Sequence, residues 1–177
     1  MKREYVLGYI QNVFLIDISY LKSLGIKYLV CDLDQTLASA FDKSPDQRVL
    51  TLRDDLKEAG IQMIIISNNF HKRVSPFCDQ VKVPYLSFAF KFAGFRVRGW
   101  LKKNHIDVND CVFVGDQLMT DGIYVKRIRG RLILTDPLVK KDNIQTIFLR
   151  KMDYHKRDVM LKKNKLGIEI PKKEEVR

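Results

Sequence analysis

The sequence lacks a hydrophobic run long enough to cross a bilayer. Its longest apolar stretch, residues 61–66, is short and is broken by Gln62, whereas a membrane-spanning helix needs about 20 apolar residues. The basic start of the chain leads into apolar residues, but Gln11, Asn12 and Asp17 interrupt them and no small-residue cleavage site follows. We therefore expect neither a membrane-spanning segment nor a secretory signal peptide.

Cysteine and histidine are scarce, with three residues of each. Cys31, Cys78 and Cys111 are odd in number and widely spaced, and no two of them form a CxxC pair. A disulfide framework or a zinc ribbon is therefore disfavoured, and a reducing cytoplasm is the expected location. The histidines show no metal-ligand spacing either.

Acidic residues are outnumbered, because 21 Asp and Glu stand against 32 Lys and Arg, for a net charge of +11. Such an excess favours an anionic partner, which could be nucleic acid, an anionic membrane surface or a phosphorylated substrate. Two basic groups contain no acid: Lys91, Arg96, Arg98, Lys102 and Lys103 form the first, and Lys126, Arg127, Arg129 and Arg131 form the second.

Short apolar runs alternate with segments of helical periodicity, which predicts an α/β fold with a doubly wound parallel sheet. We expect one domain over residues 1–177, with a catalytic core at about 24–140, an N-terminal helical segment at 1–24 and a basic helical C-terminal segment at 141–177. The expected strands are 26–31, 61–67, 84–90, 111–115 and 131–135, and the expected helices are 45–60, 69–81, 95–104 and 121–129.

Polar side chains follow four of the expected strands, at the sheet edge where ligands bind in such folds. Asp32 and Asp34 follow the first strand, Ser67 ends the second, Lys91 follows the third and Asp116 follows the fourth. Clustered carboxylates are stabilised by a divalent cation, and an all-oxygen site suits Mg²⁺. A lysine and a hydroxyl beside them can donate to phosphoryl oxygens, while one carboxylate attacks phosphorus and another exchanges protons.

These residues resemble the motifs of the haloacid dehalogenase (HAD) superfamily of phosphatases. The resemblance covers roughly residues 26–136 and rests on DLDQT at 32–36, Ser67, Lys91 and GDQLMTD at 115–121. IIISNN and VGDQLMTD are similar to the YqeG family of subclass IIIA, which is related to phosphatases of phosphatidylglycerophosphate. The fold implied is the HAD-like Rossmannoid sheet.

The resemblance also implies a role for each matching residue. Asp32 is expected to be the nucleophile and Asp34 the general acid and base. Mg²⁺ is expected to be held by Asp32, Asp34 through its backbone carbonyl, Asp116 and Asp121. The residues expected to contact the phosphate or to hold the loops around it are Thr36, Ser67, Asn68 and Lys91.

Two departures from the family pattern stand out. Phe92 follows the motif lysine where proline is usual, and Gln35 stands where Asn is commoner. The short spacings from Asp34 to Ser67 and on to Lys91 leave no room for a cap domain, so we expect a capless enzyme whose site is open to solvent. An open site suits a large substrate such as a lipid headgroup.

The expected function is an Mg²⁺-dependent phosphomonoesterase that forms an aspartyl-phosphate and acts on phosphatidylglycerophosphate at the membrane surface. The expected location is the cytoplasm, with peripheral contact to the inner face of the membrane as a possible addition. A phosphatase of a soluble sugar phosphate or nucleotide is an alternative within the enzymes. A basic nucleic-acid or ribosome-associated protein with a vestigial site is the alternative from another class.

Overall fold

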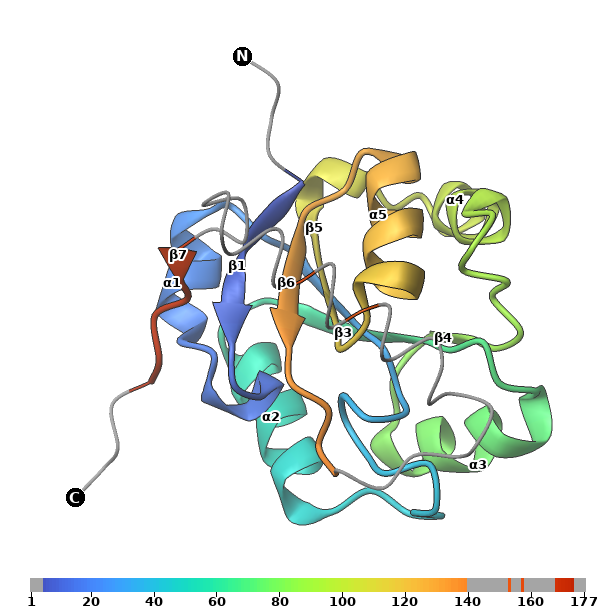
Figure 1. The fold of residues 1–177 in the computed structure, drawn as a ribbon. Coiled ribbons are helices and arrows are strands. Elements are labelled where there is room, and N and C mark those ends of the chain that lie inside the picture. The colour runs from blue at the N-terminus through green and yellow to red at the C-terminus, as the bar shows by residue number, and fades with distance from the viewer. Residues whose placement is uncertain (1–4, 140–152, 154–156, 158–167, 174–177) are drawn as a thin grey trace.

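A computed structural model describes residues 5–139, 153, 157 and 168–173. Over these residues the chain forms a parallel sheet in the order β4-β3-β2-β5-β6-β1-β7, covered by helices on both faces (Figure 1). The predicted doubly wound α/β fold is confirmed. The strands are β1 (Val6–Ile10), β2 (Tyr28–Cys31), β3 (Gln62–Ile66), β4 (Tyr85–Leu86), β5 (Cys111–Gly115), β6 (Leu132–Thr135) and β7 (Ile168–Glu169).

The helices of the described residues are α1 (Ile18–Ser23), α2 (Gln47–Glu58), α3 (His71–Val81), α4 (Phe95–Lys103) and α5 (Ile123–Ile128). Short 3₁₀ turns η1 (Val13–Leu15) and η2 (Val108–Asp110) and a π-helical turn η3 (Leu118–Gly122) connect them. The helices α1, α2 and α3 bury their apolar residues in one core and α4 and α5 bury theirs in a second, so the sheet separates two cores.

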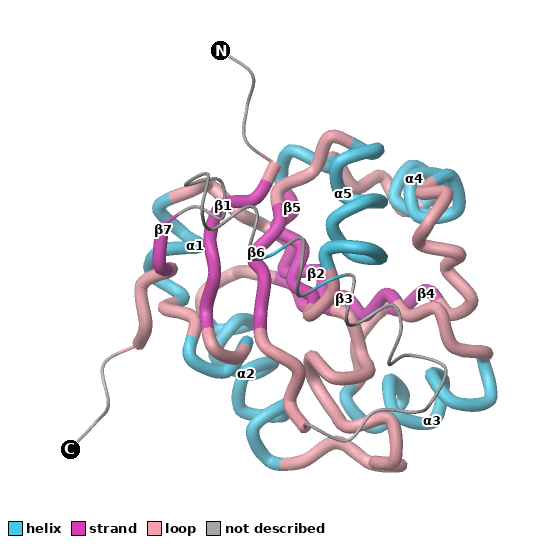
Figure 2. Tube along the Cα trace, viewed as in Figure 1, coloured by secondary structure: helices cyan, strands magenta, loops and turns pink. Residues whose placement is uncertain are grey.

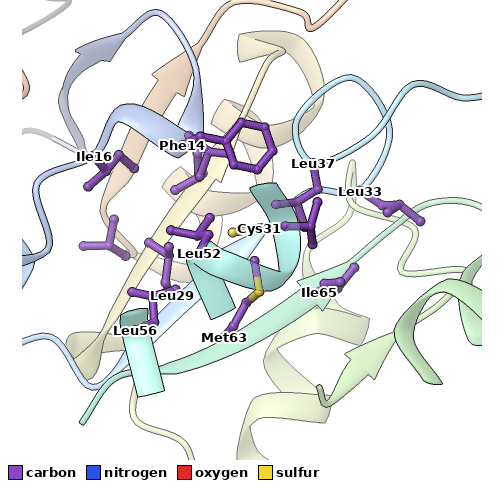
Figure 3. Packing of buried hydrophobic residues seen from close by; sticks show 14 of the residues in the cluster. Phe14, Ile16, Leu29, Cys31, Leu33, Leu37, Leu52, Leu56, Met63 and Ile65 are labelled. Carbon is purple, nitrogen blue, oxygen red and sulfur yellow. The ribbon is translucent and has the colours of Figure 1, made fainter. Parts of the chain in front are cut away.

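The strands are apolar throughout because neighbouring residues serve different cores. Cys31 and Ile65 point into the core under α2, whereas Val30, Ile64 and Phe113 point into the core under α5. Figure 3 shows the first core, where Leu52 and Leu56 of α2 lie near Cys31 and Met63 of the sheet. A strand buried on both faces needs no alternation of polar residues, which is why the sequence shows continuous apolar runs.

The helical prediction for residues 1–24 is wrong over Val6–Ile10. This segment is β1, which lies beside β6 (Figure 2) and pairs with it in parallel. Every second residue of β1 is buried. The segment forms a strand because the open edge of β6 offers it backbone hydrogen bonds, and a helix there would leave that edge unpaired. The sheet therefore extends outside the predicted core of 24–140.

The predicted helical segment at 141–177 lies largely outside the described residues. Where the chain is described again, Ile168–Glu169 forms β7 beside β1, so the helical prediction is wrong there. Asp153 and Arg157 are also described, and both are buried against the body of the sheet. At these two positions the C-terminal segment packs on the domain.

The third predicted strand is shorter than expected. Only Tyr85–Leu86 pairs with β3, and the chain then bends away from the sheet. Phe88 and Phe90 both have a φ of +47°, a left-handed conformation that bulky residues rarely adopt and that cannot continue a strand. Lys91 thus follows a short irregular segment rather than the strand itself.

Within residues 5–139, no domain is inserted between the motif-bearing strands, as the capless prediction requires. The chain passes from β2 through one loop to α2, and from β3 directly to α3. Among the helices that the structure describes, none is long and apolar enough to cross a membrane.

Candidate active site

Three carboxylates meet at the carboxyl ends of β2 and β5. Oxygens of Asp32, Asp116 and Asp121 all lie within 4.8 Å of one another. Asp32 follows β2 and Asp116 follows β5, and these two strands are neighbours in parallel register, so their ends coincide. Asp121 reaches the same point from η3.

Lys91 fills the space between the carboxylates. Its Nζ donates to Asp32 Oδ1 and, over 2.8 Å, to Asp121 Oδ1, while its side chain is 3% exposed. The ammonium also lies 5.6 Å from the centre of the Tyr124 ring, which closes the site from the side of α5. The structure thus brings Lys91 and the three acids into one polar cluster, in which Asp32 is partly exposed and the other three residues are buried.

The charges in this cluster perturb one another. Burial opposes the charge on Lys91, but Asp121 and Asp32 outweigh it and raise the pKa of the lysine, which stays protonated. Burial raises the pKa of Asp32, the nearby Lys91 works against this, and Asp121 and Asp116 raise it further. Burial is thus the main reason that the pKa of Asp32 is raised, and the two neighbouring acids add to it.

The residues fit a divalent cation. Three carboxylates against one ammonium leave an excess of two negative charges, which a divalent ion would neutralise. The donors are hard carboxylate oxygens, the type that Mg²⁺ prefers, and fewer than six of them leave positions for water and a phosphate. Asp32, Asp116 and Asp121 would supply them.

The position of Asp121 depends on a close contact with Gly115. The backbone N–H of Gln117 donates to Asp121 Oδ2 over 3.2 Å, which fixes the carboxylate against the end of β5. A Cβ added at Gly115 would lie 2.3 Å from Asp121 Cγ. Glycine is thus required at the start of the GDQLMTD motif because the Asp121 side chain occupies the space of its missing side chain.

The carboxylate of Asp34 lies outside the three-carboxylate cluster. Its Oδ2 accepts from Asn69 Nδ2 over 2.6 Å and its Oδ1 accepts from Arg73 Nη2 over 2.9 Å. Arg73 also donates to the carbonyl of Ser39, so it ties the loop after β2 to α3. Sequence reasoning missed Asn69 and Arg73, since only the fold brings α3 beside this loop.

The other residues predicted to contact the phosphate differ in their hydrogen-bond partners. Ser67 is buried, and its Oγ accepts from the backbone N–H of Asn69 over 3.0 Å, as in a turn cap. Asn68 Oδ1 accepts from the backbone N–H of Lys91 over 2.8 Å, which anchors the lysine segment. Thr36 is also buried, and among the described residues its hydroxyl has no hydrogen-bond partner.

A buried arginine from the C-terminal segment contacts the same edge of the sheet as the site. Arg157 donates to the backbone carbonyls of Asp116, directly after β5, and Thr135, the last residue of β6. Its Nε donates to Asp153 Oδ2 over 2.8 Å. Asp153 in turn accepts from the backbone N–H of Met119 over 2.9 Å. No sequence motif indicated either residue, because the pair is recognisable only once the two strand ends lie side by side.

Comparison with known proteins places the chain among phosphatases. No protein-family model matches it. It is 30% identical over 145 residues to the Bacillus subtilis protein described as "Probable phosphatase YqeG", covering 82% of this chain and 84% of that one.

Among the solved structures that share the fold at a TM-score of 0.50 are two phosphatases. One is 3-deoxy-D-manno-octulosonate 8-phosphate phosphatase from Moraxella catarrhalis, in complex with magnesium and phosphate ions and the KDO molecule, at 15% identity over 81% of this chain and 96% of that one. The other is the same enzyme from Yersinia pestis, at 13% identity over 94% and 99%. With its 30% identity to the Bacillus protein over most of both chains, the chain belongs to the YqeG family of phosphatases.

Proposed function

We propose that the protein is an Mg²⁺-dependent phosphomonoesterase whose nucleophile is Asp32. The observation that carries this proposal is the cluster of Asp32, Asp116 and Asp121 around the ammonium of Lys91. A purely structural ion pair needs only one carboxylate for one lysine. Here three carboxylates surround one lysine, which is two more than the charge of Lys91 requires. Such a buried excess is retained where a cation and a phosphate bind.

The reaction divides between the two acids of the DLDQT motif. A carboxylate oxygen of Asp32 attacks phosphorus, the bond from phosphorus to the leaving oxygen breaks, and that oxygen takes a proton from Asp34. Water then attacks the aspartyl-phosphate and gives a proton to Asp34, and the Asp32–phosphate bond breaks to release phosphate. A bound Mg²⁺ would offset charge on the phosphoryl oxygens.

The surrounding residues prepare these groups. Lys91 can donate from the Asp32 side to a phosphoryl oxygen, and its raised pKa keeps it charged during turnover. Asn69 and Arg73 fix the carboxylate of Asp34 by two hydrogen bonds, which orients it for proton transfer. Ser67 lies beside Asn69 at the end of β3, where its hydroxyl can also turn toward a phosphate.

For the substrate we propose phosphatidylglycerophosphate, which the capless enzyme binds at an anionic membrane surface. The support is the family resemblance, the lack of an inserted domain in residues 5–139 and the basic excess. Metal would be bound by Asp32, Asp116, Asp121 and the backbone carbonyl of Asp34.

The reaction class is tested with a generic phosphomonoester such as p-nitrophenyl phosphate. Phosphate release should require Mg²⁺ and fall by roughly 10³-fold or more on Asp32→Asn, because the amide cannot attack phosphorus. Asp54→Asn, a change of the same kind on α2, should leave the rate unchanged. A failure of the native protein to release phosphate from any monoester tested would favour the vestigial-site alternative.

The substrate is tested with a panel that holds phosphatidylglycerophosphate in anionic vesicles beside soluble sugar phosphates and nucleotides. We expect the highest kcat/KM for the lipid. Equal or faster turnover of a soluble phosphate would instead assign the enzyme to soluble metabolism.

A further inference from the structure

The segment that carries Lys91 exposes its aromatic side chains and buries its charged one. Phe88, Phe90 and Phe92 are 46%, 52% and 57% exposed, whereas Ala89 and Lys91 between them are buried. This inverts the usual preference, since phenylalanine is normally buried and lysine exposed. Phe88 and Phe90 were predicted to lie in a buried strand over residues 84–90, and the structure contradicts that placement.

Two more exposed phenylalanines extend this surface. The ring of Phe70, before α3, stacks on Phe88 at 5.4 Å between centroids, and that of Phe95, at the start of α4, packs edge-on against Phe90 at 6.2 Å. We call Phe70, Phe88, Phe90, Phe92 and Phe95 the phenylalanine rim. Exposed apolar side chains that gather in this way mark an interaction surface.

Cations accompany the rim. The guanidinium of Arg96 lies 5.3 Å from the Phe88 ring centre, and that of Arg127 lies 5.0 Å from the Phe92 ring centre. A groove between α4 and α5 is lined by Phe95, Arg98, Lys102 and Arg127 among others. The sequence contains no acid between Asp79 and Asp107 or between Asp121 and Asp136, so the segments that supply these cations add no acidic side chain to the surface.

The rim borders the proposed active site. Phe90 and Phe92 are the chain neighbours of Lys91, whose ammonium contacts Asp32. The backbone N–H of Phe88 donates to the carbonyl of Asn69 over 2.7 Å, and the side chain of Asn69 holds Asp34. Whatever the rim binds is therefore brought to the phosphate site.

We propose that the phenylalanine rim and the cations around it dock on the surface of an anionic lipid bilayer. The phenylalanine side chains enter the boundary between headgroups and acyl chains, and Arg96, Arg98, Lys102 and Arg127 face the lipid phosphates. Apolar aromatic residues beside arginine and lysine are the composition of interfacial membrane-binding surfaces. The inference rests on the proposed function in one respect: docking matters for catalysis only if the substrate is a phospholipid.

The arrangement of the rings favours a bilayer over single-stranded nucleic acid. Base stacking needs open ring faces, but Phe70 and Phe88 cover each other and cations lie over Phe88 and Phe92. All three rings are nevertheless exposed, which leaves apolar surface for insertion between lipids. Binding of RNA through the same residues is an outcome that the test below separates.

The test uses the inactive Asp32→Asn protein, so that binding is measured without turnover. Co-sedimentation with vesicles of equal parts phosphatidylglycerol and phosphatidylcholine should show binding that vesicles of pure phosphatidylcholine do not. Phe92→Ser should weaken binding about tenfold, because one inserted ring is lost. Phe41→Ser removes an equally exposed phenylalanine from the loop after β2, outside the rim, and should change binding less than twofold.

A second pair of variants tests the charge. Arg98→Glu with Lys102→Glu should weaken binding by at least about tenfold at physiological salt. Lys22→Glu with Lys57→Glu makes the same change in net charge on α1 and α2, across the sheet, and should have a much smaller effect. Equal losses for both pairs, or none for either, would contradict the docking surface, as would equal binding to the two vesicle types.

Two further outcomes would overturn the proposal. One is tighter binding of single-stranded RNA than of vesicles, abolished by Phe92→Ser; the other is a dimer that Phe92→Ser dissociates.

Failure of the proposed function gives different results from failure of the docking surface. If vesicle binding depends on the rim but phosphatidylglycerophosphate is not hydrolysed, the substrate is wrong and the docking surface stands. If soluble phosphomonoesters are hydrolysed with Mg²⁺ but vesicles do not bind, the docking surface is wrong and the phosphatase stands.

Discussion

The guanidinium of Arg157 donates a hydrogen bond to the backbone carbonyl of Asp116, although the two residues belong to segments far apart in the sequence. Arg157 is buried and is also paired with Asp153, which holds the backbone of Met119. Through these two residues the C-terminal segment supports the loop that carries Asp116. Arg157 is a positioning residue, because it acts on the proposed metal-binding loop through the backbone carbonyl of Asp116.

Replacing Arg157 should lower the free energy of unfolding of the protein. Arg157→Met leaves Asp153 buried without its cation, which typically costs about 3–5 kcal/mol of unfolding free energy. Arg48→Met breaks an exposed ion pair with Asp46 and should cost less than about 1 kcal/mol. Urea denaturation measures both. The double variant Arg157→Met with Asp153→Leu should be less destabilised than the sum of the single variants, and strict additivity would contradict the pairing.

Arg73 should affect turnover more than substrate affinity. Arg73→Gln removes one of the two hydrogen bonds that orient the carboxylate of Asp34, so we expect kcat to fall about 10–100-fold with little change in KM. The neighbouring exposed change Lys72→Gln should leave both constants unaltered. A rise in KM at constant kcat would show instead that Arg73 binds substrate in the ground state.

Gly115 should not tolerate even a methyl group. In Gly115→Ala the new Cβ would collide with the carboxylate of Asp121, so Asp121 must move away from Lys91 and the other two acids. We expect Mg²⁺-dependent activity to fall by at least about tenfold and the Mg²⁺ concentration for half-maximal rate to rise. Gly99→Ala, on α4 with open space around it, should keep full activity and be neutral or slightly stabilising.

The N-cap of α2 should make stability depend on acid pH. Asp46 accepts hydrogen bonds from the backbone of Val49 and from Arg48, and these outweigh burial and lower the pKa of its carboxyl. The stabilisation is complete above the unfolded-state pKa of about 4 and is lost as the pH falls through the lower folded pKa.

At neutral pH, Asp46→Ala should cost about 1 kcal/mol, whereas Asp46→Asn keeps a cap acceptor and should cost much less. Thermal unfolding between pH 3 and pH 7 measures the effect. The gap between native protein and Asp46→Ala should narrow toward pH 3, and a gap that widens there would contradict the role of the cap.

Much of the fold follows from the sequence because strands buried on both faces leave continuous apolar runs. Residues 61–67 and 111–115 were predicted as strands on this basis, and their polar ends located Ser67 and Asp116 at one edge. Residues 6–10 were not recognised as a strand, because their pairing partner β6 lies more than a hundred residues away. The residue pattern within 6–10 does not indicate a strand partner so far away in the sequence.

The site, like the fold, was predicted where local sequence patterns indicate it and missed where only tertiary contacts do. The motif acids and Lys91 were found from their spacing, but the supports of Asp34 and Asp116 were not, since Arg73 and Arg157 reach them through tertiary contacts. The exposed rings of the rim were hidden for another reason. Phe88 and Phe90 look like strand residues, and only their left-handed backbone conformation turns them out of the core.

The pairing of Gly8 in β1 with Ile168 in β7 has a consequence for how the protein is made. The partner strand β6 is synthesised more than a hundred residues after β1, and β7, which covers the other edge of β1, is synthesised later still. Until then β1 exposes apolar residues and unpaired backbone groups, the features that chaperones bind and that drive aggregation. Such non-local closure also slows folding, so a chain stalled before β6 would hold most of its active-site residues but could not complete its sheet.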